Sequence, residues 1–331
     1  MNDRNIQRRT LLLGSAAGAA TLLVPALARA ADEFPSRPLQ FICPWPAGGT
    51  ADASMRAICL VASRVLKQPI AVDNKAGAAG MIGAKAIASA KADGYTIGQI
   101  PISVTRFSQL GSLQADPLKD FTYIARTSGQ TFGIAVLPES KFRTLQEMVT
   151  HAKANPGKVT YAHAGVGGAT HVGMEEFALA AGIRLNAIAY KGGAAALNDT
   201  LGGQVDILAD SSSWAPHVDA GKLRLLATWG EQRTPRFKDT PTLKELGFKV
   251  VVDAPNGIGA PAGLPAEAEK KLRDAFRFAV NSDEFKSVAS KIDAPVMYLD
   301  GPDYKKYVGT VYERETQLIQ RLKLKELLAK G

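Results

Sequence analysis

The 331-residue sequence has only two cysteines and four histidines, and these residues form no cluster with the spacing of a metal site. The motifs G-x-S-x-G and H-E-x-x-H and a Walker phosphate loop are also absent. These absences exclude the usual zinc sites, hydrolases built on those motifs and P-loop nucleotide hydrolases. We therefore expect no metal, no cofactor and no catalytic residues.

A strong charge of one sign is also missing. Lys and Arg together number 40 against 31 Asp and Glu, and charged residues make up 21% of the chain. No segment rich in Lys and Arg is interleaved with aromatic residues, which argues against a nucleic-acid partner. We interpret the basic segment 321–330 as the solvated face of a last helix. A chain of this length with 46% hydrophobic residues is large enough for two domains.

Long apolar runs are absent except for one near the N-terminus, at 11–27. Arg8-Arg9 precedes this run and the small-x-small pattern Ala28-Arg29-Ala30 follows it. The run is too short and too rich in Gly for a membrane span, so we interpret residues 1–30 as an export signal. Cleavage near Ala30-Ala31 would place the mature chain in the periplasm. The paired arginines resemble a twin-arginine signal, but the Phe and Lys common in that pattern are missing, so Sec export stays open.

In an exported protein the two cysteines could form a disulfide bond. Cys43 ends a predicted strand, whereas Cys59 lies within the next predicted helix on the apolar face that contains Met55 and Ile58. We favour two buried thiols over a disulfide.

The rest of the chain alternates apolar strands with amphipathic helices. Strands are predicted at 39–44, 70–73, 95–100, 159–164, 185–190, 205–209 and 223–229. Helices are predicted at 51–66, from after Gly80 to 92, at 144–155, 170–181, 194–201, 214–220, 266–280 and 303–328. A repeated order of strand, loop and helix is typical of a parallel sheet, and two such blocks predict two α/β domains.

Two longer extended stretches, 121–137 and 249–260, separate these blocks. We interpret them as two crossings between domains, which makes the first domain discontinuous. The predicted first lobe therefore comprises 31–130 and 231–331, and the second comprises 131–230.

Three loops rich in Gly follow strands and open helices, at 46–50, 77–80 and 165–170. The last is not a dinucleotide fingerprint, because Thr170 stands where G-x-G-x-x-G needs its final Gly. A helix N-terminus presents unpaired N–H groups and a positive dipole end, and Gly lets an anion approach the backbone closely. One such loop alone is a tight turn, but three with this spacing favour a carboxylate site.

Several segments in register resemble one receptor family. They are F-I-C-P-W-P-A-G-G-T-A-D at 41–52, V-D-N-K-A-G-A-A-G-M-I-G-A at 72–84, A-D-G-Y-T-I-G at 92–98, Y-K-G-G-A-A-A-L-N-D-T-L-G-G-Q-V-D at 190–206, T-P-T-L-K-E-L-G at 240–247 and G-A-P-A-G-L-P at 259–265. Together with the export signal, they resemble the tripartite tricarboxylate transporter solute receptors, also called the Bug family, over essentially the whole mature chain.

The resemblance implies a two-lobed periplasmic binding protein of type II, with two parallel-type sheets, covering helices and a two-strand hinge. It implies a monomer that holds a small carboxylate between its lobes and delivers it to an integral-membrane permease. A ligand-sensing subunit of a signalling system stays an alternative. An enzyme on the same scaffold is a weaker one, with His171 beside Ser103, Asp52 or Asp210 as its candidate residues.

The family motifs also imply ligand-binding positions. In the first lobe these are Ala47, Gly48, Gly49, Thr50 and Asp52. In the second lobe they are Gly167, Gly168, Thr170, His171, Tyr190, Lys191-Gly192, Asp210 and Ser211. Asp52 could equally cap its helix and Tyr190 could equally be core, while His163 or His171 could face the ligand or serve the structure.

The sequence departs from the family pattern where the ligand would be recognised. Thr50 replaces a third Gly, Met81 replaces a frequent Asn, and 101–106, which includes Ser103, replaces a segment that usually bears Asn or His. Trp45 and Trp214 could narrow or flatten the pocket. We therefore expect a longer, more apolar carboxylate, and an aromatic acid or a dicarboxylate would meet this expectation.

Overall fold

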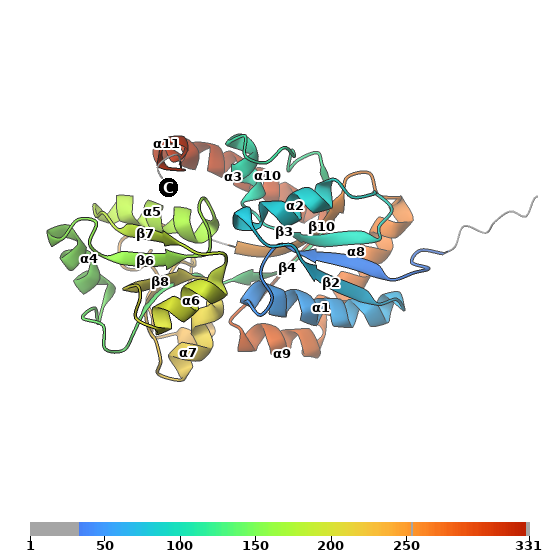
Figure 1. Ribbon diagram of the computed structural model, residues 1–331. Coiled ribbons are helices and arrows are strands. Elements are labelled where there is room, and N and C mark those ends of the chain that lie inside the picture. The colour runs from blue at the N-terminus through green and yellow to red at the C-terminus, as the bar shows by residue number, and fades with distance from the viewer. Residues whose placement is uncertain (1–32, 253, 329–331) are drawn as a thin grey trace, which may run out of the picture. The chain divides into compact units, whose positions relative to one another are not determined.

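The computed structural model describes residues 33–252 and 254–328, which form two mixed β-sheets covered by helices (Figure 1). The predicted export signal lies outside the described residues. No helix within the described ranges combines the length and apolar character needed to cross a membrane.

The first sheet contains six strands in the order β11-β4-β10-β3-β1-β2. Their bounds are β1 Leu39–Cys43, β2 Ile70–Asn74, β3 Thr96–Ile100, β4 Phe121–Gln130, β10 Ala254–Pro261 and β11 Val296–Asp300. Strand β1 pairs in parallel with β2 and β3, whereas β10 runs antiparallel to both β3 and β4. This sheet forms the first lobe.

The second sheet contains five strands in the order β7-β6-β8-β5-β9. Their bounds are β5 Gly133–Val136, β6 Thr160–His163, β7 Asn186–Ala189, β8 Ile207–Asp210 and β9 Arg224–Thr228. Strand β6 pairs in parallel with β7 and β8, whereas β5 runs antiparallel to β8 and β9. This sheet forms the second lobe.

The two-lobed α/β fold is confirmed, but the sheets are mixed and not purely parallel. The chain leaves the first sheet along β4 and returns to it along β10, so these two strands must run in opposite directions. They pair over their whole length, from Ala254 opposite Gln130 to Pro261 opposite Phe121. The two predicted crossings therefore lie side by side, and the lobe boundaries drawn from them stay a prediction.

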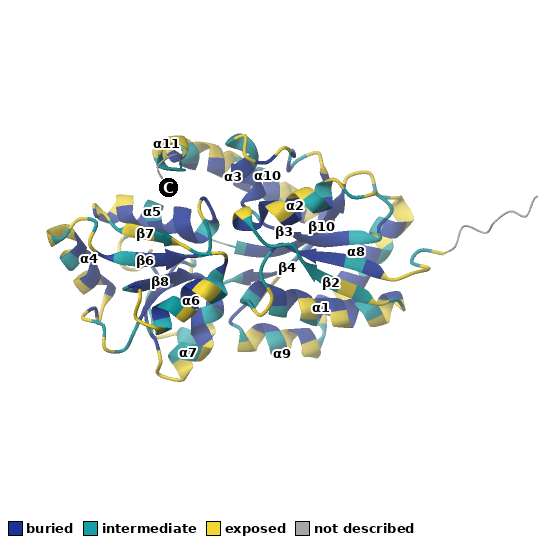
Figure 2. Cartoon of the chain, in the orientation of Figure 1, coloured by how far each residue is buried: buried dark blue, intermediate teal, exposed yellow. Residues whose placement is uncertain are grey.

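Helices cover both faces of the first sheet, and Figure 2 shows most of its strands as buried. One face packs against α1, α8 and α9, and the other packs against α2, α3 and α10. Their bounds are α1 Thr50–Leu66, α2 Met81–Ala88, α3 Val104–Gln109, α8 Ala266–Asn281, α9 Asp283–Lys291 and α10 Gly301–Arg321.

The second sheet is covered in the same way. Helices α4 and α5 pack on one face, and α6 and α7 pack on the other. Their bounds are α4 Leu145–Ala154, α5 Ala169–Ala181, α6 Gly193–Leu201 and α7 Ala215–Asp219; short 3₁₀ turns lie at Ala78–Gly80, Ser212–Trp214 and Pro235–Phe237. From the first lobe, α10 and the following α11 (Leu324–Leu328) reach α5, where Leu318 and Leu324 pack against Val172.

Most predicted elements are present. The predicted last helix is divided into α10 and α11 because Lys323 adopts a left-handed conformation with φ 49°. Helix α9 was not predicted, although the Ser282 hydroxyl caps it by accepting the Phe285 N–H. Strand β11 and helix α3 were also missed. Cys43 and Cys59 are both buried and free, as expected.

Candidate ligand-binding cleft

A cavity of about 840 Å³, which includes space open to solvent, lies between the two lobes. The first lobe lines it with Trp45, Pro46, Gly49, Thr50, Ala51, Ala79, Gln99, Pro101, Ile102, Ser103, Gln130, Ala254, Pro255 and Asn256. The second lobe lines it with Phe132, Ala164, Gly168, Ala169, Thr170, Gly193, Ala194, Asp210, Ser211 and Ser213.

The lobes touch each other beside this cavity. The Arg106 guanidinium on α3 donates a hydrogen bond of 2.8 Å to the Gly167 carbonyl in the loop before α5. Ala79 of the first lobe lies so close to Gly165 that a Cβ added there would be 3.4 Å from the Ala79 methyl carbon. The structure therefore has the cleft closed.

Helix α1 begins at the wall of the cavity. Its N-cap, Gly49, has extended backbone angles and no side chain to cap the helix, so the first turn offers its N–H groups without a side-chain partner. Gly49, Thr50 and Ala51 of this turn all line the cavity. The preceding Gly48 has φ 83°, a left-handed conformation that favours glycine, and this turns the loop toward the helix.

Helix α5 presents a second N-terminus from the other lobe. Its N-cap, Gly168, has nearly the same backbone angles as Gly49 and also provides no side-chain cap. Gly168, Ala169 and Thr170 line the cavity. Two uncapped helix N-termini, one from each lobe, therefore line one cavity, and both carry the positive end of a helix dipole.

A third helix, α6, also begins at the cavity, but a carboxylate of the protein already lies against it. A Cβ added to Gly193 would lie 2.2 Å from Asp210 Oδ2, so only glycine leaves room for this carboxylate. Asp210 accepts hydrogen bonds from the Ser213 hydroxyl and the Ser211 backbone N–H. Burial raises the pKa of Asp210 to about 6, so the group is ionised at neutral pH.

The cavity wall has one negatively charged side chain and no positively charged one, which is unusual for a site that binds an anion. Among the residues that line the cavity, Asp210 is the only one with a charged side chain, and none is Lys, Arg or His. A carboxylate bound here would therefore have to be held by backbone N–H groups, hydroxyls and side-chain amides. No group of His, Cys, Asp and Glu within the described ranges could hold a metal ion.

Several polar residues of the wall were not predicted from the sequence. Gln99 on β3 donates from Nε2 to Asn256 Oδ1 on β10, at 2.9 Å. Asn256 in turn donates from Nδ2 to the Ser128 hydroxyl, also at 2.9 Å. Gln99 and Asn256 are 3% and 1% exposed, yet both border the cavity. The only sequence signal was a single amide residue within each of the segments 95–100 and 249–260.

The structure brings eight of the predicted ligand-binding residues to the cavity. These are Trp45, Gly49, Thr50, Ser103, Gly168, Thr170, Asp210 and Ser211. The other predicted positions do not line it; they are Ala47, Gly48, Asp52, Gly167, His171, Tyr190, Lys191 and Gly192.

The side chains placed away from the cavity have partners within the protein. Asp52 accepts from the Gly48 N–H at 3.0 Å and from Asn74 Nδ2 at 2.8 Å, and it forms an ion pair with Arg56. These contacts tie Asp52 to the loop before α1, to β2 and to α1 itself. The Tyr190 hydroxyl donates to Asp199 Oδ2 at 2.8 Å.

The histidines of the second-lobe loop lie behind it. His163 and His171 stack with ring centres 4.5 Å apart, and both are almost fully buried. Nδ1 of His171 accepts the Gly167 N–H at 3.0 Å, and Nδ1 of His163 accepts the Gly165 N–H. The pair therefore supports the loop that carries Gly168. Within the described residues, neither ring is hydrogen-bonded to Ser103 or Asp210.

Comparison with known families decides what kind of protein has this cleft. The model of the tripartite tricarboxylate transporter family receptor matches residues 54–324. The chain belongs to this family. The receptors named Bug belong with it, so the resemblance seen in the sequence motifs is confirmed.

Relatives of the receptor cover nearly its whole length. A Cupriavidus necator protein described as "UPF0065 protein in gbd 5'region" is 38% identical, over 98% of this chain and 99% of that protein. The structure of the periplasmic binding protein BugD aligns with a TM-score of 0.83 at 26% identity, covering 88% of this chain and 99% of that one. The R. palustris protein Rpa4515, solved with adipate, aligns with a TM-score of 0.82 at 26% identity, covering 87% and 98%.

Proposed function

We propose that this receptor captures a small organic carboxylate in the inter-lobe cleft and delivers it to a tripartite tricarboxylate-type permease. The observation that carries the proposal is the pair of uncapped helix N-termini, of α1 and α5, that line one cavity from opposite lobes. Family membership and the adipate bound by the related Rpa4515 support a carboxylate. The receptor performs no chemistry on its ligand.

We further propose that the receptor works in the periplasm as a monomer, after cleavage near Ala30-Ala31. The segment 1–30 supports this location through its paired arginines, its apolar run and its small-x-small ending. The twin-arginine route is our preferred one because Arg8-Arg9 is followed directly by Thr-Leu-Leu.

The Gly49→Val substitution tests the anion loop. Gly49 has backbone angles that any residue adopts, and a Cβ there would meet only the Pro46 carbonyl oxygen, at 3.7 Å. The fold should therefore tolerate valine, while its methyl groups would occupy the space beside the first turn of α1. Loss of one or two charge-assisted hydrogen bonds, worth roughly 1.5–3 kcal/mol each, should weaken carboxylate binding about tenfold to more than a hundredfold. Calorimetric titration measures this loss.

Gly309→Val is the matched control for that experiment. Gly309 lies in α10, and a Cβ there would meet no atom within 4 Å. This variant should bind the carboxylate like the parent. If Gly49→Val folds normally and also binds like the parent, the first loop is only a turn and does not hold the ligand.

Hinge closure provides a second test of the receptor function. The two lobes are joined by two crossings and touch beside the cleft, so opening requires bending of these crossings and loss of the contact between Arg106 and Gly167. Small-angle scattering should give a smaller radius of gyration with saturating ligand than without it. A fluorescence probe must first show that the protein is open without ligand. An unchanged radius of gyration at saturating ligand would then contradict closure.

A further inference from the structure

We propose that the ligand is a carboxylate that also carries a hydroxyl or ammonium group, and that Asp210 accepts a hydrogen bond from this second group. The inference rests on the proposed function and names its substrate class. It separates the expected ligand from a simple dicarboxylate, because the only charged side chain of the cavity wall is itself a carboxylate.

The position of Asp210 carries the argument. It is the last residue of β8, is 2% exposed and borders the cavity. Its carboxylate lies against Gly193, the first residue of α6, and accepts from the Ser213 hydroxyl. These contacts hold a buried anion at the wall of a site that has no side-chain cation to neutralise it.

A ligand must complement this anion. A second carboxylate beside Asp210 would place two like charges together, and because Asp210 is buried, water screens their repulsion poorly. A hydroxyl would donate one hydrogen bond to Asp210, and an ammonium would also neutralise its charge. The helix N-termini of α1 and α5 would then bind the ligand's own carboxylate. The first turn of α5 contains no acidic residue, and that of α1 contains only Asp52, whose carboxylate accepts from the Gly48 N–H of its own loop.

A panel of matched acids tests the inference on the parent protein. The panel contains unbranched carboxylates of three to eight carbons and benzoates. Each set has four members that differ only in the second group: an unsubstituted acid (hydrogen or methyl), a hydroxy acid, an amino acid and a dicarboxylate. The second group is placed at carbon 2 or at the far end. The best hydroxy or amino acid should bind roughly tenfold to a hundredfold more tightly than its dicarboxylate and its unsubstituted partner at pH 7.5. The hydroxyl and ammonium arms show which donor the site prefers.

The Asp210→Asn substitution should reverse this preference. The amide keeps the shape of the side chain but loses the negative charge, so affinity for the hydroxy or amino acid should fall about tenfold while affinity for the dicarboxylate rises. Asp199→Asn is the matched control, because Asp199 binds the Tyr190 hydroxyl and does not border the cavity.

The results that overturn the inference differ from those that overturn the function. The parent protein could instead bind a dicarboxylate most tightly, and calorimetry in two buffers could show that a proton is taken up on binding. These two results together would show that Asp210 becomes protonated to accept a second anion. That result, or a preference unchanged in Asp210→Asn, overturns the inference but leaves a carboxylate receptor. Failure of every acid in the panel to bind overturns both. The parent measurements decide the question even if Asp210→Asn does not fold.

Discussion

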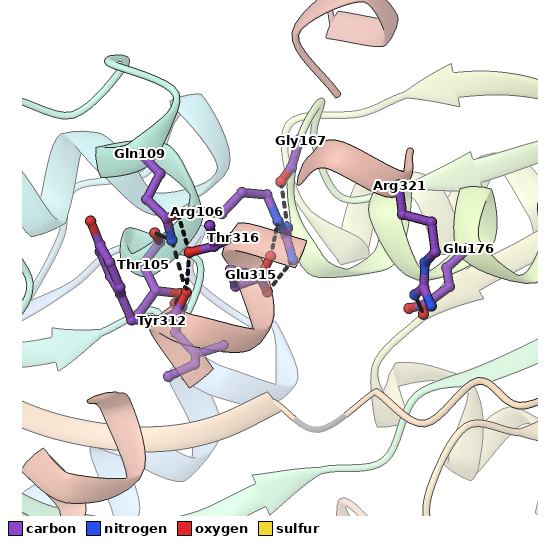
Figure 3. Close-up of polar contacts among 10 residues, drawn as sticks. Thr105, Arg106, Gln109, Gly167, Glu176, Tyr312, Glu315, Thr316 and Arg321 are labelled. Carbon is purple, nitrogen blue, oxygen red and sulfur yellow. Dashed lines mark hydrogen bonds and ion pairs between the residues drawn. The ribbon is translucent and has the colours of Figure 1, made fainter. Parts of the chain in front are cut away.

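Replacing Arg106 with methionine is expected to destabilise the receptor by about 3–5 kcal/mol, because it leaves a buried carboxylate without its partner. Arg106 on α3 and Glu315 on α10 have side chains that are 5% and 3% exposed. Nε and Nη2 of the guanidinium each donate to one Glu315 oxygen at 2.7 Å, and Nη1 donates to the Gly167 carbonyl (Figure 3). All three contacts are lost in Arg106→Met.

A double variant separates the ion pair from the packing around it. Arg106→Met with Glu315→Leu removes both charges, so no unpaired carboxylate remains, and most of the lost stability should return. The more exposed pair of Arg321 and Glu176 is the control, since the Arg321 side chain is 55% exposed and that of Glu176 is 16% exposed. Arg321→Met should cost at most about 1 kcal/mol. Urea unfolding of the parent and the three variants measures these values, and equal losses in Arg106→Met and Arg321→Met would contradict the expectation.

The same contact links stability to the binding site. Gly167 precedes Gly168, the N-cap of α5, so the guanidinium of one lobe fixes the loop that leads to the helix N-terminus of the other. On the first-lobe side, Gln109 donates to the carbonyls of Thr105 and Tyr312, and the Thr316 hydroxyl donates to Gln109 (Figure 3). Helix α3, which follows the cavity residue Ser103, is thereby held against α10.

The order of elements could be predicted because it depends on local patterns. Apolar residues at helical spacing marked α1, and the left-handed Gly182 ended α5 as expected. The antiparallel strands could not be predicted in the same way, because β10 pairs with strands more than a hundred residues earlier in the chain. Such pairing depends on the return of the chain between lobes and leaves no local pattern.

The candidate site was predictable where a loop alone forms it, as at Gly49 and Gly168. It was not predictable where neighbouring residues point in different directions. Thr170 and His171 are consecutive on α5 and therefore point about 100° apart, so Thr170 borders the cavity while His171 supports the loop behind it. Gln99 and Asn256 are joined by a hydrogen bond across 157 residues of sequence, so no motif contains both.

The buried histidine pair is expected to make the receptor lose stability as the pH falls below about 6.5. Burial is the main cause that lowers the pKa of His163 to about 3 and of His171 to about 4; the second ring adds to the shift at His163, and the charge of Arg106 adds to it at His171. An unfolded histidine titrates near pH 6.5. The unfolded state therefore binds more protons than the folded state from about pH 6.5 down to about pH 4 for His171 and about pH 3 for His163. The stability that the two neutral histidines contribute is complete above this window and is lost as the pH falls through it.

The expected loss is about 2 kcal/mol per histidine between pH 6.5 and pH 5, since each pKa unit corresponds to about 1.4 kcal/mol. Asp210 acts in the opposite direction, because a carboxyl group whose pKa is raised to about 6 stabilises the fold when it becomes protonated. The measurement is therefore best made in an Asp210→Asn background. Urea unfolding midpoints at several pH values from 7.5 to 5 give the dependence.

The double variant His163→Asn with His171→Asn identifies the source of that dependence. An asparagine oxygen can accept the Gly165 and Gly167 N–H groups that each histidine Nδ1 accepts, but it does not titrate. The double variant should therefore unfold with a much weaker dependence on pH, whereas His151→Asn, on α4 away from the pair, should behave like its parent. Equal slopes in the double variant and its parent would mean that the two rings are protonated in the folded receptor. Their stacking at 4.5 Å would then place two positive charges together in a buried site, which is the arrangement that their lowered pKa values avoid.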